Sequence, residues 1–141
     1  MRRCLSLILL LGIFTSFYSC GGYDHKTIPT VKVNITIYPD DITYANLNYI
    51  GGYEYLTGGV AGIIVYRVDM TTFMAYDRAC PYDWEDTHAW VCVDESGIML
   101  VDEHCGSYFN ILDGSVISGP AQYSLKFYKT TYDGRRLRIY N

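Results

Sequence analysis

The chain has 141 residues and a mass of 16.1 kDa, enough for one domain with a modest core and too little for two. Half of the residues are hydrophobic and only 18% are charged, a composition that excludes a disordered tail or a coiled coil. The net charge of −4 gives no support to nucleic-acid binding, and an aromatic share of 16%, with fifteen tyrosines, favours sheet over helix.

Residues 1–19 have the pattern of a secretory signal peptide. Two arginines precede an apolar run over residues 5–14, which is too short to span a bilayer comfortably. Ser19, Cys20 and the two glycines that follow resemble the lipobox of bacterial lipoproteins, in which the peptide is cut before a cysteine that carries the lipid. The resemblance implies lipid attachment at Cys20, a tether over residues 20–30 and a lipid-anchored location in the cell envelope, on the periplasmic side or at the cell surface. The alternative is an ordinary signal peptide with an incidental cysteine.

Export affects both the charge and the cysteines of the mature chain. Loss of the two N-terminal arginines leaves nine cations against fifteen acids, a net charge near −6, so attachment to a membrane must come from the lipid. Of five cysteines, Cys4 leaves with the peptide and Cys20 takes the lipid. Cys80, Cys92 and Cys105 remain in an oxidising compartment, and an odd number leaves one thiol without an intramolecular partner.

Short strands separated by turns are predicted from residue 31 onward. Residues 31–38 alternate apolar and polar side chains, the pattern of a half-buried strand. The other predicted strands lie at residues 47–50, 53–56, 63–68, 73–76, 90–93, 98–101, 125–130 and 137–140. Asp133-Gly134 is a hairpin turn between the last two, and no window keeps a 3.6-residue period. The sequence therefore predicts one all-β domain over residues 31–141 with antiparallel strands.

Alternation within two of these strands gives further expectations. Cys92 lies in the strand predicted at 90–93, where it is expected in the core. Arg136 and Arg138 alternate with Leu137 and Ile139, as on the wet side of an edge strand.

Three turn-rich segments in the second half of the chain resemble the loops of the Rieske family, β domains in which two loops hold a [2Fe–2S] cluster. In that family one loop reads Cys-x-His and the other Cys-x-x-His-Gly, followed by a Phe, an Asp or Asn, a glycine and a Gly-Pro-Ala loop. The framework residues that match are Gly106, Phe109, Asn110, Gly114 and Gly119-Pro120-Ala121. The resemblance covers about residues 62–141 and implies a β-sandwich or barrel with a small subdomain of loops of the cluster-binding type.

The ligand positions depart from the family pattern. Position by position, Cys80 and Tyr82 lie on the ligands of the first loop, and Asp102 and Cys105 lie on those of the second. A Rieske cluster takes two thiolates and two imidazoles, whereas a phenol must first lose a proton with a pKa of about 10. The resemblance therefore implies a scaffold that has lost its cluster and holds no cofactor. The alternative is an electron-transfer protein in which these four atypical ligands still hold [2Fe–2S].

In such a scaffold both loop tips point to the same place, so the resemblance also implies a disulfide between Cys80 and Cys105. Closing a loop of about 25 residues is worth roughly 3 kcal/mol in the chain-entropy model. A pairing that involves Cys92 is an alternative, and so is a single zinc ion among Cys80, Cys105, His104 and Asp102. His104 and the acidic loop Asp83-Trp84-Glu85-Asp86 are otherwise expected to be solvated.

No catalytic motif stands out: the sequence has no Gly-x-Ser-x-Gly elbow, no phosphate-binding loop and no His-Glu-x-x-His run. The function expected from the sequence is therefore a lipid-anchored, disulfide-braced binding or structural module of the cell envelope, with an envelope protein as partner and no enzymatic activity.

Overall fold

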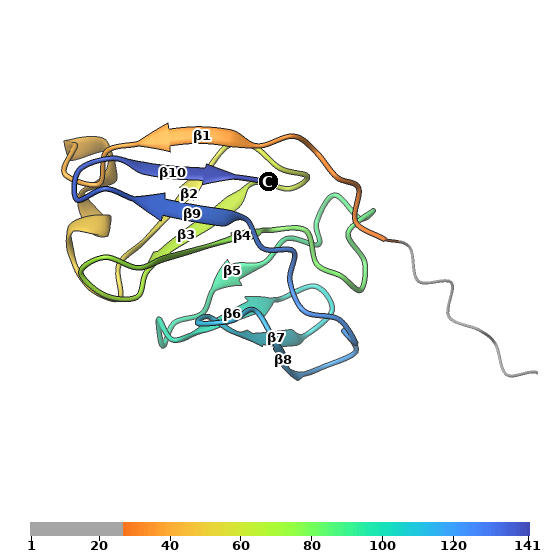
Figure 1. Cartoon of the computed structure of the whole chain (residues 1–141). Coiled ribbons are helices and arrows are strands. Elements are labelled where there is room, and N and C mark those ends of the chain that lie inside the picture. The colour runs from red at the N-terminus through yellow and green to blue at the C-terminus, as the bar shows by residue number, and fades with distance from the viewer. Residues whose placement is uncertain (1–26) are drawn as a thin grey trace, which may run out of the picture.

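The computed structural model describes residues 27–141, so residues 1–19, Cys20 and the start of the predicted tether lie outside the described residues. The described chain forms ten strands and one 3₁₀ helix (Figure 1). In chain order they are β1 (Asn34–Ile37), η1 (Ile42–Asn48), β2 (Tyr53–Leu56), β3 (Ile63–Arg67), β4 (Phe73–Asp77), β5 (Cys92–Val93), β6 (Met99–Asp102), β7 (Ser107–Asn110), β8 (Val116–Ser118), β9 (Lys129–Tyr132) and β10 (Leu137–Tyr140). Among these residues no helix has the length and apolar character needed to cross a membrane.

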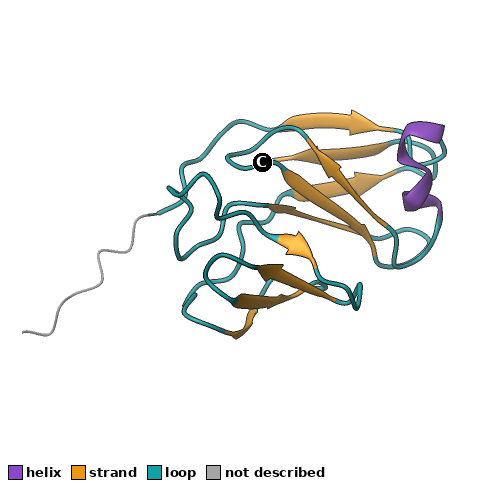
Figure 2. Ribbon diagram, turned by 180° about the vertical axis from the view of Figure 1, so that it is seen from behind, coloured by secondary structure: helices purple, strands orange, loops and turns teal. Residues whose placement is uncertain are grey.

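The strands form three antiparallel sheets, which confirms the predicted all-β class. Two three-stranded sheets, in the orders β1-β10-β9 and β2-β3-β4, make up the larger part of the domain. A four-stranded meander, β5-β6-β7-β8, lies below them in Figure 1. The helix η1 lies at the end of the domain opposite the first described residues (Figure 2).

β3 serves two hydrophobic cores because both of its faces are covered. Ile63 and Val65 pack into the core between the two three-stranded sheets. Ile64 and Tyr66 point the other way and pack into a second core, between this sheet and the four-stranded sheet. A strand that is buried on both faces needs apolar residues at consecutive positions, which explains the β-branched run from residue 63. The second core supports the loops that carry the candidate site.

Residues 47–50 do not form the predicted strand. The chain makes the helix η1 here, whose N-cap Asp41 accepts a hydrogen bond from the Thr43 backbone N–H at 2.8 Å. Leu47 is fully buried within this helix and packs into the first core. The strand prediction was wrong because aromatic content alone does not separate a strand from a short helix that has one buried anchor.

The end of the chain also differs from the prediction. β9 begins at Lys129, and residues 125–127 contribute only the isolated bridge between Phe127 and Tyr76. β10 has the predicted bounds; its one arginine, Arg138, is exposed, as is Arg136 just before it, while Leu137 and Ile139 are buried. It is not an edge strand, however, because β1 and β9 pair with it on either side. The strands β7 and β8 were not predicted.

Cys92 is half-buried rather than in the core, so that prediction was also wrong. Val91 takes the fully buried position beside it. The Cys92 sulfur accepts a hydrogen bond from the Arg78 guanidinium at 3.2 Å. The alternation in this short strand is therefore displaced by one residue from the predicted one.

Candidate metal centre

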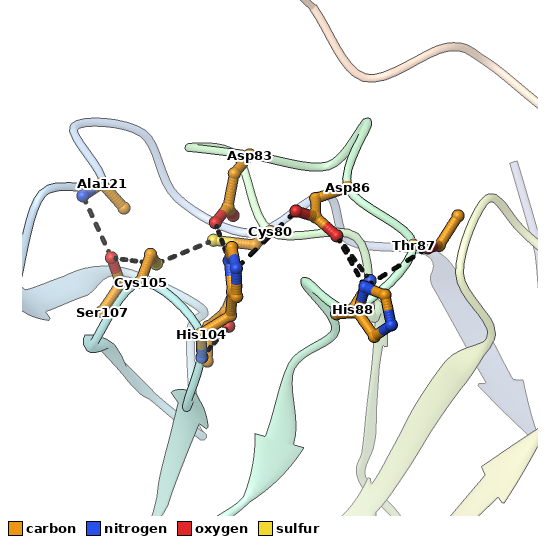
Figure 3. Close-up of polar contacts among 10 residues, drawn as sticks. Cys80, Asp83, Asp86, Thr87, His88, His104, Cys105, Ser107 and Ala121 are labelled. Carbon is orange, nitrogen blue, oxygen red and sulfur yellow. Dashed lines mark hydrogen bonds and ion pairs between the residues drawn. The ribbon is translucent and has the colours of Figure 1, made fainter.

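Two loops bring Cys80 and Cys105 together. Cys80 follows β4, where the buried Asp77 carboxylate accepts the Ala79 backbone N–H at 2.9 Å and fixes the start of the loop. Cys105 lies in the turn between β6 and β7. The two Sγ atoms are 3.6 Å apart and share a thiol hydrogen bond, and neither cysteine forms a disulfide (Figure 3). The predicted disulfide stays a prediction.

Two carboxylates join the sulfurs. Asp102 ends β6 and is fully buried, and Asp83 lies three residues after Cys80 with a side chain that is only 17% exposed. Cys80, Asp83, Asp102 and Cys105 each offer one potential ligand atom, and these atoms all lie within 4.8 Å of one another. The structure therefore assembles two sulfur and two oxygen donors at the meeting point of the loops.

His104 holds both carboxylates from outside this group. Its backbone N–H donates to Asp102 Oδ1 at 2.9 Å, and its ring Nδ1 lies 2.9 Å from Asp83 Oδ2. The second ring nitrogen lies 3.6 Å from the Asp86 carboxylate (Figure 3). The remaining oxygens, Asp83 Oδ1 and Asp102 Oδ2, are buried and have no hydrogen-bond partner. Buried carboxylate oxygens are rarely left without partners, and a cation would satisfy both.

A third loop supports Cys105. The buried Ser107 accepts the Ala121 backbone N–H at 3.1 Å, and its hydroxyl oxygen also lies 3.1 Å from Cys105 Sγ. Gly119 permits this approach, because a Cβ there would lie 2.5 Å from Ser107 Cα. The Gly-Pro-Ala segment therefore fixes the second loop through a serine at the start of β7.

Burial controls the protonation of the two thiols. It raises the pKa of the Cys80 thiol far above its usual value, and the nearby Asp102 carboxylate raises it further. Burial also raises the pKa of Cys105, although hydrogen bonds from Ser107 oppose that effect. The hydrogen bond to Asp83 raises the pKa of His104. A metal cation bound by these thiols and the two carboxylates would favour the thiolate forms.

The structure brings together three of the four residues that the sequence placed on ligand positions: Cys80, Asp102 and Cys105. Tyr82, the fourth of these residues, is 40% exposed. Asp83, which the sequence did not place on a ligand position, belongs to the donor group, contrary to the expectation that this acidic loop is solvated. The sequence feature that could have identified Asp83 as a candidate ligand is a carboxylate in a turn, three residues after a loop cysteine. His104, named as a zinc ligand in one alternative, instead holds two of the ligands.

The prediction that the domain holds no cofactor was wrong. It assumed that the donor set had been lost with the histidines, whereas four suitable donors lie within reach of one ion. Two thiolates around a tetrahedral ion, with metal–sulfur bonds of about 2.3 Å, lie about 3.8 Å apart. The observed separation of 3.6 Å fits this arrangement. The present spacing fits one ion, whereas a [2Fe–2S] cluster would spread the same four ligands over two irons.

The chain is similar to known proteins only in its three-dimensional structure. No family model and no curated protein matches the chain. One similar solved chain comes from the complex of a reduced oxygenase and an oxidized ferredoxin in carbazole 1,9a-dioxygenase; it is 23% identical, with a TM-score of 0.46, over 64% of this chain and 81% of that one. Another, assigned as the small subunit of an NADH-dependent nitrite reductase from Mycobacterium tuberculosis, is 18% identical, with a TM-score of 0.47, over 79% of this chain and 97% of that one.

Proposed function

We propose that this domain is a metal-binding electron-transfer module built on a Rieske-like scaffold, with atypical ligands. Cys80, Asp83, Asp102 and Cys105 would hold one metal ion between the two loops. The observation that carries the proposal is the convergence of these four donors, two of which leave a buried carboxylate oxygen without a partner. The ordered framework from Gly106 to Ala121, which resembles that of the Rieske family, supports the electron-transfer role.

The proposed electron-transfer role favours iron. Two thiolates and two carboxylates at buried and partly buried positions supply four negative charges, which calls for a multiply charged cation. Thiolate ligands suit iron and zinc, and of these two only iron changes its oxidation state. When bound, the ion would accept and release one electron. The chain's own residues bind it and hold its ligands: His104 fixes the two carboxylates, and Ser107 fixes Cys105.

We also place the module in the cell envelope, anchored by lipid at Cys20. The support is the lipobox-like sequence after an apolar segment. A protein partner in the envelope would then supply or receive the electron.

Metal analysis of the full chain tests the proposed function. The protein is purified anaerobically with reductant and titrated with Fe(II), and iron, acid-labile sulfide and free thiols are counted. We expect about one iron per chain, no labile sulfide, and visible absorbance that changes on oxidation and reduction. Two irons with sulfide would keep the electron-transfer role and contradict the one-ion geometry. In a second sample prepared in air without reductant, a metal-free protein whose mass is two hydrogens lower would contradict the metal site and establish the disulfide instead.

Two matched pairs of variants locate the ion. Asp83→Asn removes a proposed ligand, whereas Asp86→Asn removes a carboxylate of the same loop that lies outside the donor group. Cys105→Ser and Cys92→Ser compare a proposed ligand with the cysteine beside Arg78. The first member of each pair should weaken iron binding at least about tenfold, and the second should leave it within about twofold. Equal losses within either pair would contradict the assignment.

A further inference from the structure

Basic residues are concentrated at the end of the chain. Residues 129–141 carry four cations and one carboxylate, whereas residues 27–128 carry four cations and thirteen carboxylates. The four cations are Lys129, Arg135, Arg136 and Arg138. This segment forms β9, β10 and their turn, so one hairpin of an acidic protein has a net positive charge. Such an asymmetry indicates an anionic ligand.

A groove lies on the outer face of the sheet formed by β1, β10 and β9, which is at the top of Figure 1. Its volume is about 560 Å³, and hydroxyl, amide and guanidinium groups dominate its lining. The lining residues are Asn34, Thr36, Tyr38, Thr131, Tyr132, Asp133, Arg136 and Arg138. None of the four proposed metal ligands lines it, so the groove is independent of that site.

Arg138 lines the groove, and two contacts orient its guanidinium. It belongs to the central strand, and its partners in register are Thr36 on β1 and Thr131 on β9. Its Nε donates to Asn34 Oδ1 at 2.9 Å, and its guanidinium lies 4.8 Å from the centre of the Tyr140 ring. Among the described residues no carboxylate pairs with it. Its outer nitrogens are therefore available to an anion.

Arg136 lines the same groove beside a single acid. Its guanidinium lies 3.1 Å from the Asp133 carboxylate, and both side chains are more than half exposed. The Asp133 carboxylate also accepts the backbone N–H groups of Arg135 and Arg136, so its main role is to close the turn. An exposed ion pair of this kind is weak, and an anionic ligand can compete for the guanidinium.

We propose that this groove binds an acidic oligosaccharide, with a uronate carboxylate on Arg138 and sugar hydroxyls on the threonine and asparagine side chains around it. A groove on the face of a sheet has no unpaired backbone groups to offer to a peptide, because the ladder hydrogen bonds satisfy them. Side chains that donate and accept hydrogen bonds around one guanidinium instead match a ligand that has both hydroxyl and carboxylate groups.

Calorimetric titration of the full chain at low ionic strength tests the proposal with three probes: tetragalacturonate, its uncharged methyl ester and a tetraglutamate peptide. We expect tetragalacturonate to bind, and to bind at least about tenfold more tightly than either of the other two. Binding should weaken as salt is added. If the ester bound equally well, the groove would not recognise the carboxylate charge. If the peptide bound equally well, the groove would not recognise the sugar hydroxyls. Each result would overturn the proposal.

Variants of the hairpin test the site itself. Arg138→Gln should lower the affinity at least about tenfold. Arg135→Gln removes the same charge from the adjacent turn; this residue does not line the groove and contacts it only through the Tyr38 ring, so the affinity should fall by less than for Arg138→Gln, about twofold to threefold. Thr131→Ala, at an exposed position in register with Arg138, provides a second probe should the arginine variant fold poorly. Equal losses for the two arginines, or self-association of the chain through this hairpin in sedimentation analysis, would overturn the site.

Discussion

Tyr82 and Asp83 are adjacent in sequence and differ in their surroundings. The tyrosine side chain is 40% exposed, whereas the Asp83 side chain is 17% exposed and bonds to His104. The turn after Cys80 brings the Asp83 carboxylate within 4.8 Å of both sulfurs. At the scale of single residues, the fourth donor of the group therefore lies one position away from the residue that the sequence placed there.

Asp69 shows the same dependence on a turn, with a measurable effect on stability. Its Oδ1 accepts the backbone N–H groups of Thr71 and Thr72 at 2.7 and 2.8 Å in the turn between β3 and β4. The bond from Thr71 is the main cause that lowers the pKa of this carboxyl below 3.8. We expect NMR titration of the native protein to show a pKa for Asp69 below that value.

The sign of the linked stability change follows from this pKa. A carboxyl whose pKa is lower in the folded state stabilises the fold above its unfolded pKa, and this contribution disappears as the pH falls through the folded pKa. The Asp69→Asn variant should therefore lose less stability than the wild type between about pH 4 and pH 2 in urea denaturation. Parallel curves for the two proteins would contradict the prediction.

At the scale of elements, the site depends on how closely the Gly119 segment approaches the β6–β7 hairpin. A Cβ on Gly119 would lie 2.5 Å from Ser107 Cα and 2.7 Å from the Gly106 carbonyl oxygen. Both neighbours are backbone, so neither can rotate away. The contact also orders Ser107, which lies against Cys105.

Gly119→Ala should therefore lower the free energy of unfolding by more than backbone strain alone would. Gly97 provides the control, because its φ is also positive and a Cβ there would meet no atom within 4 Å. We expect Gly97→Ala to lower the free energy of unfolding by about 1 kcal/mol and Gly119→Ala by about 1–3 kcal/mol more. Chemical denaturation measures both, and equal effects would show that the close approach does not matter.

β3 contributes side chains to both cores, so shortening one of its buried side chains should strongly lower the free energy of unfolding. Ile64 is fully buried in the core between β3 and the four-stranded sheet. Ile64→Ala should reduce the free energy of unfolding by about 2–5 kcal/mol. Ile98→Ala, at a residue that is 65% exposed, should change it by about 0.5 kcal/mol or less. A small effect at Ile64 in urea denaturation would contradict a core role for that face.

At the scale of the whole molecule, the opposite signs of charge lie on different parts of the chain. The acidic loop around Asp83 and Asp86 lies beside the proposed metal centre, while the basic hairpin of β9 and β10 belongs to another sheet. The two proposed sites are thus carried by different sheets. A ligand bound in the proposed groove would therefore hold the domain in place without covering the loops of the proposed metal centre.

Membrane attachment is tested on the full chain expressed in a bacterium. We expect the wild-type protein in the membrane fraction, with lipid on Cys20, because acyl chains supply the anchor that an acidic surface cannot. Cys20→Ala should move the protein to the soluble fraction, and Cys4→Ala, which alters only the predicted signal peptide, should not. Equal membrane recovery of all three proteins, measured by fractionation and intact mass, would contradict the lipid anchor.

The sequence alone determined the class of the fold and most of its strands. β-Branched runs such as residues 63–67 and the Asp-Gly turn at 133–134 are local signals, since strand propensity and turn geometry depend on neighbouring residues. The ordered glycines and the Gly-Pro-Ala segment also indicated where the loops meet.

Only the tertiary structure decided which side chains enter the site. Asp83 lies with the sulfurs, and His104 bonds to the Asp83 and Asp102 carboxylates. Cys92 is half-buried and accepts a hydrogen bond from Arg78. Each outcome depends on the direction of a side chain in a loop or a very short strand. That direction is set by contacts with segments distant in the sequence, and no local pattern records it.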